Sequence, residues 1–424
     1  MIAGGRGDTA IPYGIPMRYL ITGCAALALA WTTLALRPGL LTGHLAVPAA
    51  LAVTHLLTLA FATSILLGAM HQLVPVLLVT RLHAPRLGDA TFALVAPGAA
   101  AIVLGFALGY RVPLLATGGD AVLAGLLLFD YNLLRTFLAA RRRDAVSVAM
   151  LCSALYLTLT ALLGLLLALR LVVPALVGVV GHATPLHLGL GLMGAFGVAI
   201  AGAGHRLLSM FVLSHGVSRA RVAWLLWSVF GALAALALQT FAGWPLGPLA
   251  ASFAVAAASL FTLDVVAILR VRLRRRIEPP MATYVAGPAF LGIAAAAILA
   301  GRPDVAVMAV LTGFVTLSIA GMLVKIVAFL TWQHRFAASV GRGAVPLVKD
   351  LTVPKLEVAT ATGLGIGAAA ACAAAAWSWT AVASLAGVAG AIGAWALALH
   401  LAWIVFAPRA ATATAPVAPL GGIP

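Results

Sequence analysis

Long uninterrupted apolar stretches recur along almost the whole chain, and they constrain its fold more than any other feature. Hydrophobic residues make up 63% of the 424 residues and charged residues only 8%, and the mean hydropathy is +1.13. A soluble domain carries about 25% charged residues, so this chain has too little polar surface to coat a soluble globule. The composition predicts an integral membrane protein and excludes a soluble enzyme, a DNA-binding domain and a secreted disulfide scaffold.

Charged residues and Pro/Gly breaks divide the chain into twelve apolar stretches, each able to supply the roughly 20 residues that a membrane-spanning helix needs. They lie near residues 17–37, 45–80, 91–110, 120–140, 146–173, 184–214, 222–243, 247–270, 282–300, 303–334, 357–377 and 380–407. We expect an all-α, polytopic membrane protein in which residues 1–409 form a single twelve-helix domain. The segment 410–424, rich in Ala, Thr, Pro and Gly, is expected to be a disordered tail.

The distribution of Lys and Arg among the connections predicts the orientation of the chain. Twenty of these cations lie on one side, whereas the other side holds only Arg37, Arg111, Arg170 and Arg302. Because basic residues mark the cytoplasmic side, we expect a multi-pass protein of the cell (inner) membrane with both termini in the cytoplasm. The basic clusters at 141–143 and 272–276 are interpreted as topology signals and contacts with the lipid bilayer, not as a nucleic-acid surface.

The three cysteines are isolated in separate apolar stretches. Cys24, Cys152 and Cys372 show neither a metal-ligand spacing nor a disulfide pattern. We interpret each of them as a small buried core residue.

A short motif recurs at an interval of four helices. It reads GAMHQLVP at 68–75, GAGHRLLS at 202–209 and GMLVKIVA at 321–328. The three copies lie in the second, sixth and tenth apolar stretches, which are among the longest. The repeat predicts three arcs of four helices with the second, sixth and tenth helices innermost.

This pattern, with histidines on the second and sixth helices, resembles subunit I of the heme-copper oxidase superfamily. The resemblance rests on THLLTLA (54–60) through MHQLVP (70–75), on HLGLGLMG (187–194) through GHRLLSMF (204–211), and on KIVAFLTW (325–332). It implies a pseudo-threefold arrangement of the twelve helices. It also implies that His55 stands where that family binds a low-spin heme, and that His187 is the nearest match to a copper-binding histidine.

Two departures from the family bear on the reaction. The adjacent histidine pair of the family's seventh helix has no counterpart between Trp224 and Trp244, and the pair of the tenth helix is missing between Val305 and Phe329. Neither the complete copper site nor the usual high-spin heme site can form without them, so ordinary oxygen reduction is not expected. The chain also resembles the divergent heme- and copper-containing twelve-helix membrane proteins associated with nitric oxide stress.

Four of the ten histidines lie well inside the second and sixth stretches, where coordinating side chains are candidates for function. His55 and His71 are about 24 Å apart along a straight helix, and His187 and His205 about 27 Å, so each helix carries one outer and one inner histidine. At about 100° per residue His187 and His205 share a face, whereas His55 and His71 differ by about 160°. This argues against two stacked bis-histidine hemes unless the second helix is distorted.

We therefore expect one heme b near the outer leaflet with axial ligands His55 and His187, and copper is the second candidate. An interhelical hydrogen bond is the alternative role for each histidine. Small residues near the two histidines leave room for a flat macrocycle or serve ordinary helix packing: Ala60, Ala62, Gly189, Gly191, Gly194 and Gly197. Asp130 and Asp264 are expected toward helix ends, where snorkelling is easy.

A second group of polar residues occupies related repeat positions near the cytoplasmic ends of the inner helices: His71, Gln72, His205, Arg206 and Lys325. Their convergence would form a cationic pocket for a heme propionate, a quinone headgroup or an anion. The alternative is that Arg206 and Lys325 snorkel to lipid phosphates. No Asp or Glu lies at the same depth of these three helices, so we expect the partner of a buried cation to be a cofactor carboxylate, a lipid phosphate or a carbonyl group.

The remaining histidines that bear on the interpretation are His83, His215 and His334, expected at the membrane interface, and His400, expected to serve packing. Three functions follow as alternatives. The first is a heme-binding membrane protein without a complete copper and high-spin heme centre, acting in electron transfer, gas response or cofactor handling with a quinone or other redox subunits. The second is a transporter or channel. The third is a cofactor-free subunit of a larger respiratory complex.

Overall fold

The computed structural model describes residues 11–141, 143–214 and 218–406. The predicted tail at 410–424, Arg142 and His215 lie outside this part of the chain. Within it, twelve helical spans are long and apolar enough to cross a membrane, and this confirms the prediction of an all-α, multi-pass membrane protein.

The spans begin and end as follows. Nine of them are single helices: α1 (Gly14–Leu36), α4 (Pro85–Ala107), α5 (Val112–Ala139), α6 (Ala145–Leu169), α10 (Arg219–Ala242), α11 (Gly247–Arg270), α12 (Pro279–Leu299), α15 (Pro354–Trp377) and α16 (Thr380–Phe406). The second, sixth and tenth spans are composite: α2 (Pro48–His55), η2 (Leu56–Thr63) and α3 (Ser64–Leu78); α8 (Thr184–Leu188), η3 (Gly189–Gly197) and α9 (Val198–Val212); α13 (Pro303–Met308), η4 (Ala309–Val315) and α14 (Thr316–Phe336). Short helices occupy four connections: η1 (Pro38–Leu41), α7 (Ala175–Val180), η5 (Ala337–Ser339) and η6 (Val348–Leu351).

Several helices begin earlier than the apolar pattern predicts. The third span starts at Pro85 instead of 91, and the fourth at Val112 instead of 120. The reason is that Pro85 and Pro113 lie in the first turn of their helices, where the missing N–H of proline costs no hydrogen bond. The charged Asp89 also lies near the start of α4, so a charged residue does not mark the boundary of this helix.

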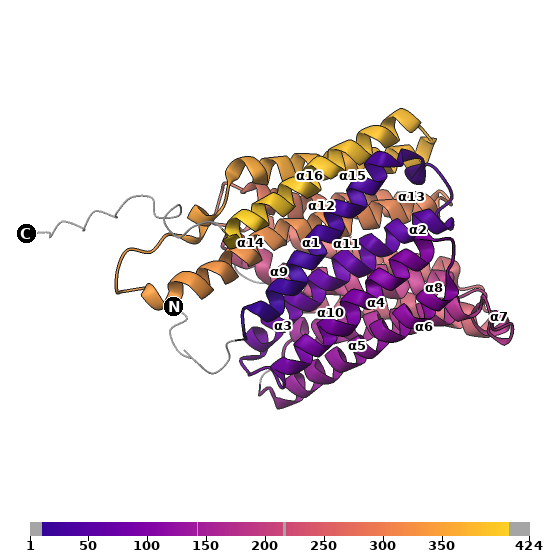
Figure 1. Ribbon diagram of the computed structural model, residues 1–424, viewed down its shortest axis with the longest axis horizontal. Helices are drawn as coiled ribbons and strands as arrows, with labels where there is room; N and C mark the ends of the chain where they lie inside the picture. Colours follow the sequence, from indigo (N-terminus) through magenta and orange to yellow (C-terminus); the bar gives the residue numbers. More distant parts are fainter. Residues whose placement is uncertain (1–10, 142, 215–217, 407–424) are drawn as a thin grey trace, which may run out of the picture.

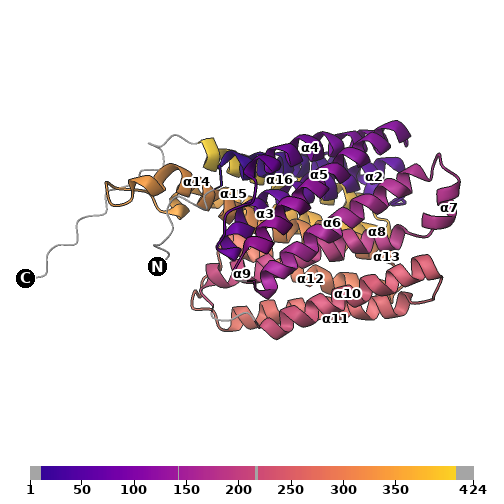
Figure 2. The same cartoon turned by 90° about the horizontal axis from the view of Figure 1, so that it is seen from below.

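Successive spans are neighbours around the molecule, and the last returns to the first. α1 packs against η2 and α3, α5 against α4 and α6, α10 against α11, and α15 against α16, which closes the ring on α1. Gly14 and Phe406 therefore lie on one side of the bundle, called here the termini side, and α7 lies at the far side (Figure 1). Figure 2 shows α10 and α11 as a separate layer along one flank.

The composite spans are the innermost of those that the structure describes. In their most apolar stretches 61%, 61% and 83% of the residues are buried, against at most 56% in any other span. η4 contacts both η2 and η3, so the three spans meet inside the ring. This agrees with the position that the repeat predicts for the second, sixth and tenth helices.

Each composite span contains one wide π-helical stretch at an equivalent place. The stretches begin at Leu56, Gly189 and Ala309, and the motif glycines Gly68, Gly202 and Gly321 follow after 12, 13 and 12 residues. π-helical segments are frequent at functional sites, and they rotate everything beyond them about the helix axis. The apolar pattern alone gives no sign of them.

The motif glycines explain why the repeat has small residues at these positions. A Cβ at Gly68 would meet the Cβ of Tyr19 in α1 at 2.8 Å, and one at Gly202 would meet the Cβ of Ala149 in α6 at 2.9 Å. At Gly321 it would meet the backbone of Tyr284 in α12 at 2.7 Å. In every copy, therefore, the span that directly precedes in the chain packs closely on the glycine.

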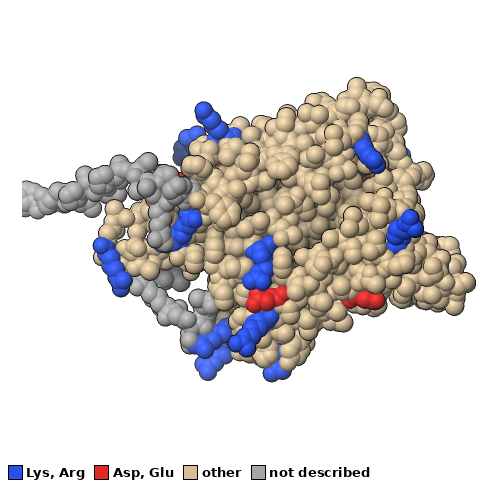
Figure 3. Space-filling model, in the orientation of Figure 1, with Lys and Arg blue, Asp and Glu red and all other residues tan. Residues whose placement is uncertain are grey.

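The outer surface of the spans is apolar, as a lipid environment requires. Leu29 and Leu138 are each 56% exposed, and Trp224 and Trp244 lie exposed near opposite ends of α10, as in an aromatic belt. Figure 3 shows Lys and Arg gathered at the termini side of the visible face, with few elsewhere on it. A lipid bilayer is accordingly the environment of this protein.

α15 and α16 pack through glycines with almost no space between their backbones. A Cβ at Gly363 would lie 2.5 Å from the backbone nitrogen of Gly393, and one at Gly367 would lie 2.8 Å from the Cα of Gly390. Close backbone approach through small residues is the usual basis of helix association in membranes. Gly365 points the other way, into open space.

We therefore predict that Gly363→Leu destabilises the protein and that Gly365→Leu does not. Overpacking typically costs about 1–3 kcal/mol, and the upper end is expected because the obstacle is backbone and cannot move aside. Thermal unfolding in detergent, followed by size-exclusion chromatography, measures the difference. Equal melting temperatures for the two variants would contradict the packing described here.

Candidate functional site

His55 and His187 lie at the far side of the bundle, each close to the start of a π-helical stretch. His55 is the last residue of α2, directly before η2, and His187 is the next-to-last residue of α8, two residues before η3 begins. Met308, the last residue of α13, lies directly before η4. Two of the three inner spans thus present an imidazole near the start of their π-helical stretch.

Both imidazoles are held by one ring nitrogen. The Nδ1 of His55 lies 2.8 Å from the carbonyl oxygen of Leu51, and the Nδ1 of His187 lies 3.1 Å from that of Thr160 in α6. Since a carbonyl can only accept, Nδ1–H must be the donor in each case, and the neutral ring keeps its lone pair on Nε2. Among the described residues, none bonds the Nε2 of either histidine. A metal-ligating histidine is held in the same way by its second nitrogen, but His71 shows that a histidine packed in a helix bundle can have this arrangement as well.

The two rings lie in the arc formed by the second to sixth spans. His55 stacks on Phe106 of α4, with ring centroids 4.7 Å apart. The Cε1 of His187 would be only 2.9 Å from a Cβ at Gly164 of α6. Both rings are half-buried. Two anchored imidazoles therefore share one arc of the bundle.

The straight-helix calculation of histidine faces is wrong for both inner helices, because each is widened by a π-helical stretch between its two histidines. His55 and His71, expected about 160° apart, both contact α4, through Phe106 and Gly88. His187 and His205, expected on one face, contact α6 and α11 instead. His71 therefore lies against the same helix as His55, but His205 does not lie against the same helix as His187, so the inner histidines do not form a second facing pair.

The space beside the glycines near His187 is largely occupied by neighbouring side chains. A Cβ at Gly194 would lie 3.0 Å from the ring of Tyr156, and one at Gly189 would lie 2.8 Å from Leu236 of α10. These two glycines serve helix packing. Gly191 is less tightly covered, with Thr160 as its nearest contact at 3.3 Å.

His71 is enclosed by aromatic rings. It stacks on Tyr19 at 5.4 Å and meets Phe129 edge-on at 5.0 Å. Its Nδ1 donates to the carbonyl of Leu67 at 2.7 Å, and its buried Nε2 lies against Gly88 and has no hydrogen-bond partner among the residues that the structure describes. An unsatisfied buried nitrogen of this kind is uncommon, yet the surrounding rings leave it little space.

The sixth, seventh and eighth spans are joined by a buried charge network. The Nδ1 of His205 is 3.0 Å from Asp264, and both side chains are 1% exposed. The other carboxylate oxygen of Asp264 accepts from Arg221 at 2.6 Å. The expectation that Asp264 snorkels is wrong because these two partners hold it inside. Asp130 is also buried and accepts from Thr158 at 2.6 Å.

The sequence did not indicate this network. In the sequence Arg221 is one of the twenty cations that indicate topology, and the position of Asp264 indicates only that it lies near a helix end. The available signal was that Asp264 lies in an apolar run, where a carboxylate needs a partner.

The expected cationic pocket at the termini side does not form. Arg206 is 59% exposed and lies 3.8 Å from Asp144, whereas Lys325 forms an ion pair with Glu278 at the start of α12. His71 and His205 have separate contacts as well. The four charged or histidine side chains of the expected pocket therefore lie in four different environments. The expectation of a cofactor, lipid or carbonyl partner for Lys325 is wrong, because Glu278, in the connection between α11 and α12, reaches it.

Glu278 lies outside the spans, and its surroundings favour its charged form. Burial would raise the pKa of its carboxyl group, but Lys325, with Arg274 and Arg276, holds that pKa below its ordinary value. The ion pair with Lys325 is accordingly formed at neutral pH.

The other histidines and the cysteines fit structural roles. His334 stacks on Tyr13 at 4.3 Å, His83 is exposed, and His400 is buried and accepts from the backbone N–H of Val353 at 2.9 Å. Cys24 and Cys372 are buried as predicted, and Cys152 is only partly buried. No group of three or more His, Cys, Asp and Glu residues suited to a metal ion occurs in the described part of the chain.

No family model matches this chain, and no curated protein is significantly similar to it.

The buried network makes a stability prediction that does not depend on any cofactor. Asp264→Asn removes the counter-charge of Arg221, and Asp264 is 1% exposed whereas Arg221 is 36% exposed. The expected loss is therefore larger than that of a surface pair, up to the roughly 3 kcal/mol of a fully buried one. Asp89→Asn is the matched control, because Asp89 and its partner Arg18 are 47% and 39% exposed and such pairs contribute about 0–1 kcal/mol. SDS titration of the purified protein measures both. A loss for Asp264→Asn no larger than for Asp89→Asn would show that the network is not stabilising.

Proposed function

We propose that this protein is a heme-binding membrane protein of the heme-copper oxidase subunit I type, without a complete copper and high-spin heme centre. It acts in electron transfer, gas response or cofactor handling. The observation that supports this most is the pair formed by His55 and His187, two anchored imidazoles with free Nε2 atoms in one arc of the bundle.

The fold agrees with this proposal. Three inner spans with one π-helical stretch each, a shared motif glycine and a ring of twelve spans closed by α1 and α16 are what a pseudo-threefold repeat of four helices produces. The agreement concerns architecture, and architecture alone does not determine activity.

His55 and His187 would hold a heme b. Their backbone hydrogen bonds engage Nδ1, so Nε2 would bind the iron, and the low polarity of the bundle would suit a porphyrin. When bound, heme iron supplies one-electron chemistry or binding of a diatomic gas. The contribution of the chain is then to hold both imidazoles in one tautomer and to keep the site away from bulk water.

Copper is the less favoured metal. In the family that the chain resembles, copper needs further histidines from the seventh helix, and α10 contains none between Trp224 and Trp244. His187 is moreover turned toward α6 by its bond to Thr160. A quinone or another redox subunit is the partner class that would exchange electrons with the heme.

The roles first expected for the inner residues are modified by their contacts. His205 and Lys325 are engaged by Asp264 and Glu278, and Arg206 faces outward. We therefore propose His55 and His187 as the ligands, and His71, His205, Arg206 and Lys325 as residues of the surrounding structure.

The central test is the absorption spectrum of the purified protein before and after reduction with dithionite, with metal analysis of the same sample. We expect a Soret band and a sharp reduced α band. His55→Ala and His187→Ala should each remove or convert the low-spin spectrum while the protein remains folded. His83→Ala is the control, because His83 is exposed and lies elsewhere.

The contrary outcomes are equally specific. A full spectrum in both ligand variants would overturn the ligand assignment. A colourless and metal-free preparation would favour the transporter, the channel or the cofactor-free subunit.

The proposed orientation places both termini in the cytoplasm of the inner membrane. In a variant whose three cysteines are replaced, a cysteine at Arg275 should react only with reagent on the cytoplasmic side, and cysteines at Arg111 and Trp244 only with reagent from outside. These positions lie in the connections whose charge difference sets orientation. Labelling of the Arg275 position from outside would invert the topology.

A further inference from the structure

The ends of α9 and α11 meet on the termini side of the bundle (Figure 2). α9 ends in a left-handed turn at Leu213, whose φ is 53°. The connection that follows α11 crosses this turn, because the backbone N–H of Leu273 donates to the carbonyl oxygen of Leu213 at 3.2 Å. Residues 209–214 and 271–274 therefore form one local structure, called here the α9–α11 corner.

Three polar atoms of this corner are buried and have no partner within the described part of the chain: the hydroxyls of Ser209 and Ser214 and the Nε of Arg272. The two serines are held together, because the backbone N–H of Ser214 donates to the carbonyl oxygen of Ser209 at 2.9 Å. Arg272 directly precedes Leu273, which bonds the turn. The Nη1 of Arg272 donates to the carbonyl oxygen of Leu269 at 2.5 Å, so its guanidinium is held against the end of α11.

The chemistry of these three groups indicates what is missing. All of them can donate a hydrogen bond, and Arg272 also carries a positive charge. Buried polar groups without partners are uncommon, so three in one corner indicate an acceptor with several oxygen atoms. Water can accept from the hydroxyls but leaves the charge of the guanidinium unbalanced, whereas a phosphate group does both. A phosphate is therefore the chemical group that fits the corner.

The surface beside the three donors is apolar. Met210, Leu213, Val271 and Leu273 are each more than half exposed, and all four lie at the ends of the spans. A free phosphate ion gains nothing from apolar neighbours, whereas the glycerol and the acyl chains of a phospholipid can cover them. The corner thus combines donors for a phosphate with a surface for the hydrocarbon to which that phosphate is attached.

The charges around the corner favour a lipid with a net negative charge. Arg270, Arg275 and Arg276 are exposed beside it, and Arg206 lies one turn before Ser209 on the same face of α9. The ammonium group of a zwitterionic lipid would be repelled by these cations, whereas an anionic headgroup is attracted. An anionic glycerophospholipid is the ligand that matches donors, apolar surface and charge together.

We infer that the α9–α11 corner is a binding site for one anionic phospholipid, whose phosphate accepts hydrogen bonds from Arg272, Ser209 and Ser214. This goes beyond a general attraction of the basic connections to the membrane surface, because only these donors are buried and without partners. The site does not depend on heme.

Native mass spectrometry of the purified full-length protein, delipidated in detergent and titrated with dioleoyl phosphatidylglycerol, tests this inference. We expect one saturable lipid adduct, bound about fivefold more tightly than dioleoyl phosphatidylcholine. Arg272→Gln should weaken the binding of phosphatidylglycerol about tenfold, the effect of one hydrogen bond between charged groups. Ser209→Ala and Ser214→Ala should each weaken it about fivefold.

Arg275→Gln is the matched control for the arginine, because it removes the same charge from the same connection at an exposed position. Ser228→Ala is the control for the serines, since the hydroxyl of Ser228 already donates to the carbonyl oxygen of Trp224. Both controls should bind the lipid as the wild type does. If Arg272→Gln does not elute as a folded protein, Ser214→Ala decides the question.

Three outcomes would overturn the inference. Equal losses for Arg272→Gln and Arg275→Gln would show a general attraction to charge instead of a site. Equal binding of phosphatidylglycerol and phosphatidylcholine would exclude an anionic lipid as the preferred ligand. Displacement of the lipid by an equal concentration of inorganic phosphate would show that the corner takes free phosphate. Because the readout is the lipid adduct, its failure is distinct from the absence of a heme spectrum.

Discussion

The need to satisfy every backbone polar group within its own span is the constraint on which the rest of this structure depends. In hydrocarbon an unpaired N–H or carbonyl group is very costly, so a span cannot break in order to aim its side chains. A π-helical stretch changes the direction of the side chains and keeps the backbone bonded. The second, sixth and tenth spans each use one such stretch. His55 and His71 therefore both lie against α4. His187 lies against α6, whereas His205 is turned toward α11.

This constraint also explains which parts could be predicted from the sequence. Apolar runs gave the number and order of the spans, because transfer to lipid depends on composition alone. The repeat gave the inner helices, because Gly68, Gly202 and Gly321 mark the same close contact with the preceding span. The sequence pattern could not predict which neighbouring helix each of the four histidines contacts, namely His55, His71, His187 and His205. One widened turn rotates every residue beyond it. The start of α4 at Pro85 was missed because the apolar pattern carries no information on the first turn of a helix.

The charged residues were predicted least well, for a related reason. Sequence position shows depth in the membrane, but it does not show which neighbouring span supplies a partner. Lys325 is paired by Glu278, 47 residues away along the chain, and Asp264 by His205 and Arg221. Each of these pairs joins parts of the chain that are neighbours in the bundle. A buried charge in such a bundle is accordingly better predicted from the spans beside it than from its own helix.

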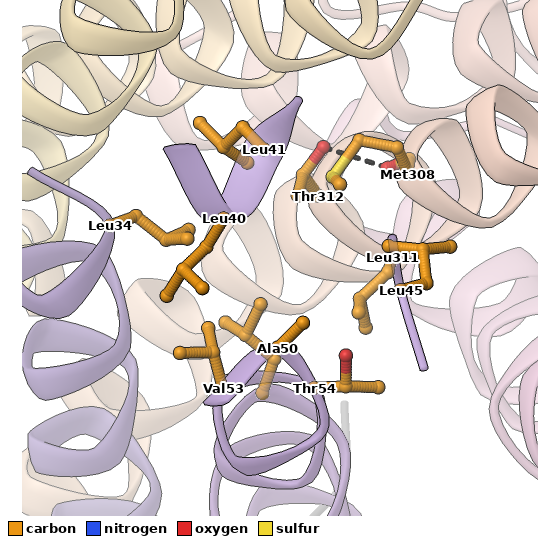
Figure 4. A pocket seen from close by; sticks show the side chains of 11 residues that line it. Leu34, Leu40, Leu41, Leu45, Ala50, Val53, Thr54, Met308, Leu311 and Thr312 are labelled. Carbon is orange, nitrogen blue, oxygen red and sulfur yellow. Dashed lines mark hydrogen bonds between the residues drawn. The ribbon is translucent and has the colours of Figure 1, made fainter. Parts of the chain in front are cut away.

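The direction of His55 follows from how α2 ends. His55 turns to α4, whereas Thr54, one residue earlier, lies beside apolar side chains of α1 and the tenth span (Figure 4). The π-helical stretch η2 starts directly after His55, where the helix is wider and its side chains are less closely spaced. The tenth span has Met308 near the start of its π-helical stretch, where the second and sixth spans have imidazoles. The third copy of the repeat therefore presents an apolar side chain to the centre of the bundle, because no change of direction in its backbone can replace a polar group that its sequence lacks.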